Sequence, residues 1–177
     1  MRIDIAQLAP NLEAEFMQWR TGEGDPAEWT VVADASAEGG RAIAQVSKDK
    51  TGYRFPLAIY KPFSGSDVEV SVRFKPVAGT VDQAGGIAVR LLTPDDYYVV
   101  RANALEDNVR FYRVIKGERE QIAGANVKVT SGWWHSLGLR AEGNHVTVAF
   151  DGTHLFEADD KTLTEAGKVR CGPRQIV

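Results

Sequence analysis

Residues 67–75 alternate polar and apolar side chains almost without fault, and this period of two constrains the fold more than any other feature of the chain. Val68, Val70, Val72 and Phe74 fall on one face of an extended segment, which is the pattern of a strand with one buried face. Shorter runs of the same kind, separated by turn residues, cover residues 29–32, 42–46, 54–59, 86–92, 97–105, 109–115, 127–129, 135–141, 145–150 and 155–157.

Strands that follow one another about every ten residues, with no long helix between them, predict an all-β sandwich or barrel. A chain of 177 residues without repeats or a linker suits a single domain over residues 1–177. Residues 1–28 are expected to be an irregular lead-in. Within it, residues 11–19 favour a turn or two of helix that Gly22, Gly24 and Pro26 end.

Composition excludes several classes of protein. With 21 basic and 24 acidic side chains, the net charge of −3 disfavours a nucleic-acid binder. No stretch approaches 18 apolar residues, so no membrane-spanning helix is expected. Cys171 is the one cysteine, which excludes an internal disulfide and a cysteine-based metal site. Residues 1–10 lack the apolar core and cleavage site of an export signal, and the localisation stays open.

The two runs at 86–92 and 97–105 are joined by a turn at residues 93–96 and predict a hairpin. If Leu92 pairs with Tyr97, then Arg90 lies opposite Val99 and Arg101 opposite Ala88. One face of the hairpin is then apolar, and the other carries Arg90, Arg101 and Asn103. Polar residues in the middle of strands indicate either a solvated outer face or a ligand site on an open, concave sheet.

Aromatic residues suggest what such a site would bind, because sugar rings stack on aromatic faces while their hydroxyls accept hydrogen bonds from Arg and Asn. The candidates are Tyr97, Tyr112, Trp133 and Trp134. Since Trp133 and Trp134 are neighbours and point in opposite directions, we expect one in the core and the other partly exposed. Trp134 is retained as a ligand-binding candidate.

The sequence identifies no catalytic residue and no metal ligand. A retaining glycosidase needs two carboxylates about 5 Å apart, and the adjacent acidic pairs are better explained as turn residues, with Glu157 and Asp159 expected in a loop. The three histidines lack the spacing of a zinc site. Calcium bound by loop carboxylates stays an alternative. The acidic candidates are Asp95, Asp96, Glu106, Asp107, Glu157, Asp159 and Asp160. The histidines are His135, His145 and His154, and the calcium candidates are Asp82, Asp95 and Asp96.

Several segments resemble a bacterial group of concanavalin A-like, laminin-G-like jelly-roll proteins. They are residues 53–58 (YRFPLA), 70–76 (VSVRFKP), 82–86 (DQAGG), 134–137 (WHSL), 148–152 (VAFDG) and above all 96–108 (DYYVVRANALEDN). The resemblance implies a two-sheet antiparallel jelly-roll β-sandwich with one curved sheet. Relatives are largely exported and are described as glycoside hydrolases, 3-keto-disaccharide hydrolases or sugar-binding modules. The paired acids of the laminarinase-type enzymes are missing from this chain.

The tail at residues 170–177 departs from that group, which usually continues Gly-Leu-Trp-Thr-Lys-Ala-Asp-Ser into a last strand. If residues 170–177 are encoded CGG TGT GGA CCA AGG CAG ATA GTN, a shifted frame reads Val-Trp-Thr-Lys-Ala-Asp-Ser. A one-base frame slip would therefore explain the tail, would remove the final strand and would leave Cys171 without a role. Resequencing the source DNA tests this hypothesis.

Together these observations predict a carbohydrate-binding domain whose concave face uses Arg90, Tyr97, Arg101, Asn103, Tyr112 and Trp134. A glycan is the expected partner, with no cofactor. Two alternatives stay open: a glycoside hydrolase-like enzyme whose carboxylates come from different strands, and a structural or interaction domain without a small-molecule site.

Overall fold

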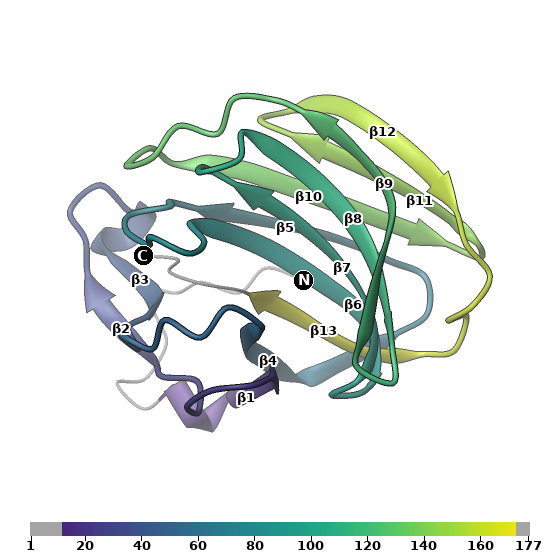
Figure 1. Cartoon of the computed structure of the whole chain (residues 1–177), viewed down its shortest axis with the longest axis horizontal. Coiled ribbons are helices and arrows are strands. Elements are labelled where there is room, and N and C mark those ends of the chain that lie inside the picture. Colours follow the sequence, from purple (N-terminus) through teal and green to yellow (C-terminus); the bar gives the residue numbers. More distant parts are fainter. Residues whose placement is uncertain (1–11, 173–177) are drawn as a thin grey trace.

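The computed structural model describes residues 12–172 and shows a β-sandwich (Figure 1), which confirms the predicted fold class. Two 3-10 turns, η2 (Leu12–Ala14) and η3 (Glu38–Gly40), interrupt the strands. In chain order the strands are β1 (Phe16–Gly22), β2 (Trp29–Ala33), β3 (Arg41–Gln45), β4 (Arg54–Gly65), β5 (Val68–Phe74), β6 (Ala84–Thr93), β7 (Asp96–Asn103), β8 (Asn108–Ile115), β9 (Glu118–Asn126), β10 (His135–Glu142), β11 (His145–Phe150), β12 (Thr153–Asp159) and β13 (Gly167–Gly172).

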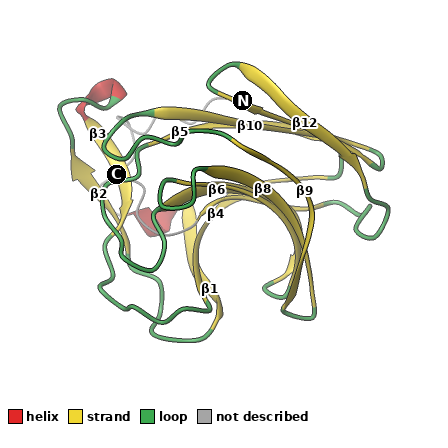
Figure 2. Ribbon diagram, turned by 45° about the horizontal axis from the view of Figure 1, so that its top comes forward, coloured by secondary structure: helices red, strands yellow, loops and turns green. Residues whose placement is uncertain are grey.

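The strands form two main sheets and a small one. A seven-stranded sheet has the order β1-β4-β13-β6-β7-β8-β9, and a four-stranded sheet has the order β12-β11-β10-β5. β2 and β3 pair separately. All pairings are antiparallel. Figure 2 shows the seven-stranded sheet curling into an arc beneath the flatter four-stranded sheet, so that its concave face turns away from the sandwich interior.

The main core fills the space between the two large sheets, because period-two alternation turns one face of each strand inward. Phe74 of β5 lies at its centre with no exposed surface, and packs against the rings of His135 and Phe150. Gly85 on β6 allows this close approach of the sheets, since a Cβ there would lie 2.4 Å from Cδ2 of Phe74. Other buried members of this core include Ile87, Val89, Tyr98, Val100, Phe111, Leu137, Leu139 and Val148.

Three parts of the predicted secondary structure were wrong. The helix expected at residues 11–19 is a short 3-10 turn followed by β1, whose backbone pairs with β4 from Phe16 to Gly22. The segment 127–129, expected to be a strand, is a loop. The edge strand β9 that precedes it was not predicted, because its first four residues are polar and exposed and show no alternation. The sequence did not predict β13 either. The segment 1–28, which was expected to be irregular, contains β1, a strand of the seven-stranded sheet.

The atypical tail begins inside β13, where Arg170 and Cys171 pair with Ile59 and Ala58 on one side and with Ala88 and Ile87 on the other. Residues 1–11 and 173–177 lie outside the described residues, and the expectation about an export signal falls on residues 1–10 of that part. Within residues 12–172, no helix has the length and apolar character needed to cross a membrane.

Candidate functional site

The candidate site lies on the concave face of the seven-stranded sheet, where the pairing register aligns side chains in rows across β6 to β9. The asparagine row consists of Ala84, Asn103, Asn108 and Asn126, and the arginine row consists of Gly86, Arg101, Arg110 and Gly124. The tyrosine row consists of Ala88, Val99, Tyr112 and Gln121. The last row, on β7 to β9, consists of Tyr97, Val114 and Arg119. Glycines at both ends of the arginine row leave its two guanidinium groups without flanking side chains.

Arg101 is the buried centre of the site, with only 7% of its surface exposed. Its Nη1 lies 3.5 Å from Oδ2 of Asp82, and its Nη2 donates a hydrogen bond of 2.7 Å to Oε2 of Glu106. Burial raises the pKa of Glu106, but the hydrogen bond from Asn108 and the charge of Arg101 outweigh it and hold that pKa below its ordinary value. The Nε of Arg101 is buried and has no hydrogen-bond partner among residues 12–172.

The asparagine row also contains unused hydrogen-bonding groups. Nδ2 of Asn103 and Oδ1 of Asn108 are buried and have no partner within the described chain. The other groups of these residues are occupied, since Oδ1 of Asn103 accepts from the amide of Leu105 and Nδ2 of Asn108 donates to Glu106. Buried polar groups in native proteins are usually paired, so three unpaired groups in adjacent rows mark this region as a candidate binding site.

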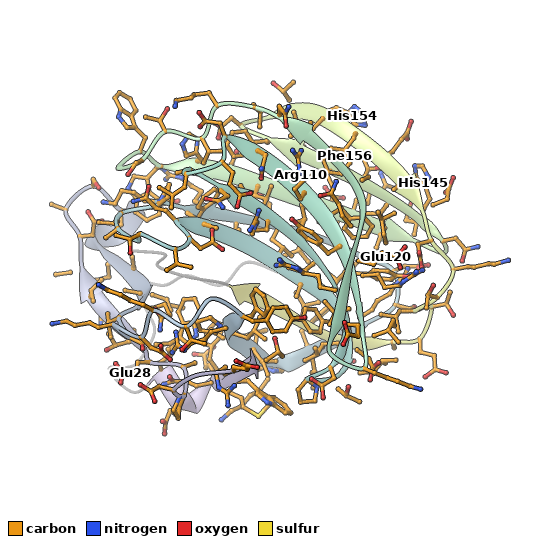
Figure 3. All side chains as sticks on the ribbon, viewed as in Figure 1. Glu28, Arg110, Glu120, His145, His154 and Phe156 are labelled. Carbon is orange, nitrogen blue, oxygen red and sulfur yellow. The ribbon has the colours of Figure 1, made fainter. Side chains whose placement is uncertain are left out.

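Arg110, labelled in Figure 3, lies on β8. Its Nη2 donates to Oδ1 of Asn126 at 2.6 Å. Gly124, directly opposite on β9, makes this possible because a Cβ there would lie 2.5 Å from Cδ of Arg110.

The middle of the concave face is apolar and packed. Ile59, Ala88, Leu91, Tyr97, Val99, Tyr112 and Val114 form a second buried cluster that is separate from the main core. The hydroxyl of Tyr97 shares a hydrogen bond of 2.9 Å with Thr21 of β1. The guanidinium groups of Arg101 and Arg119 lie 5.7 and 4.6 Å from the ring centre of Tyr112. Tyr112 is therefore not an open stacking platform in this conformation; it positions two cations.

Curvature brings the two ends of the sheet together across the concave face. The guanidinium of Arg119 on β9 lies 4.8 Å from the ring centre of Phe55 on β4, although four strands separate them in the sheet. Nearby, the hydroxyl of Tyr53 donates to the carbonyl of Gly117 at 2.7 Å. These two contacts, which we call the latch, fix Arg119 above Tyr112.

Arg90 does not lie on the concave face, and the predicted hairpin register was wrong. Val99 pairs with Ala88 rather than Arg90, and the register shifts between Val89 and Thr93. Arg90 adopts a φ of 52°, and this irregularity turns its side chain inward, where it is 0% exposed. Its guanidinium donates to the carbonyls of Ser66, Leu163 and Gly143 at 2.7–2.8 Å.

The predicted tryptophan adjoins the other large sheet rather than the one that carries the arginine row. Trp134 precedes β10 of the four-stranded sheet, donates to Ser36 Oγ at 3.0 Å and lies beneath Arg73 and Lys75. Trp133 is 69% exposed. Neither ring is in the core, so the expectation that one would be buried was wrong.

Of the six predicted site residues, Tyr97, Arg101, Asn103 and Tyr112 lie on the concave face. Sequence reasoning missed Asn108 and Arg110, although alternation along β8 places both on the same face as Tyr112. Glu106 was interpreted as a turn residue only. Its neighbour Asp107 does serve the turn, with a φ of 49° and hydrogen bonds from Lys128 and the amide of Val129.

The carboxylates expected as possible calcium ligands do not converge. Asp82 faces Arg101, whereas Asp96 accepts hydrogen bonds from Thr93 and from the amide of Lys116. Among the residues that the structure describes, no group of three or more His, Cys, Asp or Glu side chains is arranged to hold a metal ion. His135 instead binds Asp151 at 2.7 Å.

His145 on β11, labelled in Figure 3, lies between two carboxylates of the edge strand β12. Glu157 and Asp159 are thus in a strand rather than the expected loop. Nδ1 of His145 lies 2.9 Å from Asp159, and Nε2 lies 3.0 Å from Glu157. The hydrogen bond with Asp159, followed by that with Glu157, raises the pKa of His145.

We expect the pKa of His145 to fall toward its ordinary value in Asp159→Asn, as measured by NMR titration of the imidazole. Because the folded-state pKa is raised, the protonated ring stabilises the fold. This contribution is complete below the unfolded-state pKa and is lost as the pH rises through the folded-state pKa. An unchanged pKa in Asp159→Asn would show that the pairing is not maintained in solution.

A separate open pocket of about 670 Å³ lies beside β1 and β2. Its lining includes Gln18, Arg20, Glu28 and Trp29, and Glu28 is labelled in Figure 3. No residue of the four rows lines it.

Comparison with protein-family models and with curated proteins finds no match. Solved structures do match in fold. The carbohydrate-binding module CBM66 from Bacillus subtilis is 17% identical, with a TM-score of 0.70 over 85% of each chain. A Caenorhabditis elegans galectin is 16% identical, with a TM-score of 0.52 over 67% of this chain and 83% of the galectin.

Domain 4 of an extracellular arabinanase from Geobacillus stearothermophilus, solved with arabinotriose, is 14% identical. Its TM-score is 0.52 over 90% of this chain and 84% of that domain. At these identities the comparisons establish shared architecture. The chain shares the β-sandwich fold of these three structures.

Proposed function

We propose that this protein binds carbohydrate on the concave face of its seven-stranded sheet. The observation that carries the proposal is the arginine row, where Arg101 and Arg110 lie directly opposite each other on neighbouring strands. Like charges in that position destabilise a sheet. This pair therefore does not itself stabilise the pairing of the two strands, which supports a role in recognition.

The groups in these rows suit a polyhydroxylated ligand. Guanidinium and amide N–H groups donate to sugar oxygens, while a carboxylate accepts hydrogen bonds from hydroxyls. Glu106 and Arg119 are exposed and Arg110 is half-buried, so their polar groups are accessible to a ligand. The plane of the Arg119 guanidinium, supported by Phe55 and Tyr112, offers a flat surface where the sequence predicted an aromatic ring.

The structural neighbours support the same proposal, since their names describe a carbohydrate-binding module, a galectin and an arabinanase domain bound to arabinotriose. No observation favours the hydrolase alternative. The lowered pKa of Glu106 keeps it deprotonated near neutral pH, whereas a general acid needs a raised pKa.

The test is a glycan array followed by calorimetry on the glycans that bind. Arg101→Ala is expected to weaken binding at least tenfold, about 1.4 kcal/mol. Because Arg101 is buried, Arg110→Gln is the second variant, and it should weaken binding without lowering the thermal midpoint. Arg140→Ala is the matched control, since this exposed arginine lies on the four-stranded sheet and pairs with Glu142.

Silence of the folded wild-type protein across the array would reject the proposal and favour a structural or interaction domain. Binding that neither Arg101→Ala nor Arg110→Gln affects would place the site elsewhere.

A further inference from the structure

The concave face carries an excess of positive charge that its own carboxylates do not balance. It holds three guanidinium groups, those of Arg101, Arg110 and Arg119, against the carboxylates of Asp82 and Glu106. Both of these carboxylates are bound to Arg101. The other two arginines are the more accessible ones.

The direct contacts of Arg110 and Arg119 are with neutral groups, and the charge of Arg110 acts on Glu106 only at longer range. Arg110 donates to Asn126 Oδ1 and to the carbonyl of Val109. Arg119 contacts the rings of Phe55 and Tyr112. Within residues 12–172, neither guanidinium lies within ion-pair distance of a carboxylate.

The acidic residues of β9 do not neutralise these arginines. Glu120, labelled in Figure 3, pairs with Arg113 at 2.6 Å. Arg113 in turn lies 2.6 Å from Asp160, which follows β12 of the four-stranded sheet. These contacts direct Glu120 away from the concave face and toward the junction of the two sheets.

We propose that the ligand is an acidic saccharide with more than one carboxylate or sulfate group, of which one is bound by Arg110 and another by Arg119. This inference rests on the proposed carbohydrate-binding function and specifies the class of glycan. Guanidinium groups bind such anions through paired, charge-assisted hydrogen bonds that are about twice as strong as neutral ones. Both side chains are fixed in advance, Arg110 by the space that Gly124 leaves and Arg119 by the latch, so little side-chain entropy is lost on binding.

The arrangement also determines where the neutral part of the ligand lies. Arg110 and the row that contains Arg119 are four residues apart along the strands, about 13 Å. Between them lie Tyr112 and the exposed amide of Gln121. A saccharide that spans the two rows would place its hydroxyls against Gln121 while its anionic groups pair with the two guanidinium groups.

The experiment is a glycan array in which each acidic saccharide is paired with its neutral form. Oligogalacturonates are paired with their methyl esters, and sulfated oligosaccharides with their desulfated forms, so that the two kinds of anion are distinguished. We expect at least one acidic member to bind tenfold or more tightly than its neutral partner. Arg119→Gln and Arg110→Gln should each reduce that ratio at least threefold, whereas Arg140→Gln should leave it unchanged.

Equal binding of acidic and neutral partners, or binding of neutral glycans alone, would overturn this inference and leave the proposed function intact. A preference for acids that Arg140→Gln reduces as much as Arg119→Gln does would show attraction by overall charge only, and would also overturn it. If no glycan of either kind binds, the proposed function itself fails.

Discussion

Replacing Arg90 with methionine is expected to lower the free energy of unfolding by about 3–5 kcal/mol. The guanidinium is fully buried and donates one hydrogen bond to each of the carbonyls of Ser66, Leu163 and Gly143. These carbonyls belong to three separate connections, β4–β5, β12–β13 and β10–β11. Methionine fills much of the same volume but leaves three acceptors without a donor.

Denaturant unfolding monitored by tryptophan fluorescence measures this effect. Arg90→Lys should recover only part of the loss, because one ammonium group cannot reach three carbonyls that the planar guanidinium serves in different directions. Arg140→Met is the control and should change stability by less than about 0.5 kcal/mol, since Arg140 is exposed. A loss below about 1 kcal/mol in Arg90→Met would contradict the role assigned to these hydrogen bonds.

Gly85→Ala is expected to destabilise the protein by about 1–3 kcal/mol, although it adds a single methyl group. The new Cβ would lie 2.4, 2.6 and 3.1 Å from three atoms of Phe74, on the facing sheet. Phe74 is 0% exposed and packed by neighbouring rings, so it cannot move aside without opening the core. Thermal and denaturant unfolding measure the loss.

A double-mutant cycle separates this clash from a general intolerance of alanine in strands. Phe74→Leu removes ring atoms near Gly85, so Gly85→Ala should be less harmful in that background, with a coupling above about 0.5 kcal/mol. Gly138→Ala is the matched control, because its Cβ would meet Ala149 at 3.7 Å, an ordinary contact. Additive effects of the Gly85 and Phe74 substitutions would refute the proposed clash.

Alternation was sufficient to predict the fold class and most strands, because half-buried strands must repeat every two residues. It failed where that pattern is weak or short. β9 begins with polar, exposed residues at an edge, and β13 presents only Val169 to the main core among its described side chains. β1 was interpreted as helix, and only its pairing with β4 identifies it as a strand.

The candidate site was partly predictable for the same reason. Arg101 and Asn103 share a face because they are two residues apart, and this holds in any strand. Arg90 was misplaced because a local irregularity reverses faces, and its sequence position gives no sign of it. Arg119 could not be found, since its contact with Phe55 depends on the curvature of the whole sheet.

The position of β13 has a consequence for how the molecule assembles. It is the last described strand along the chain, yet it lies between β4 and β6 and joins the β1-β4 pair to the β6-β9 meander. The local hairpins can form early. The curved sheet across which Arg119 contacts Phe55 is complete only when β13, which follows all of these hairpins in the sequence, has joined it. Such non-local pairing slows folding. During synthesis, the concave face should therefore be completed only after β13 has emerged, so that the proposed carbohydrate site forms late in the life of the nascent chain.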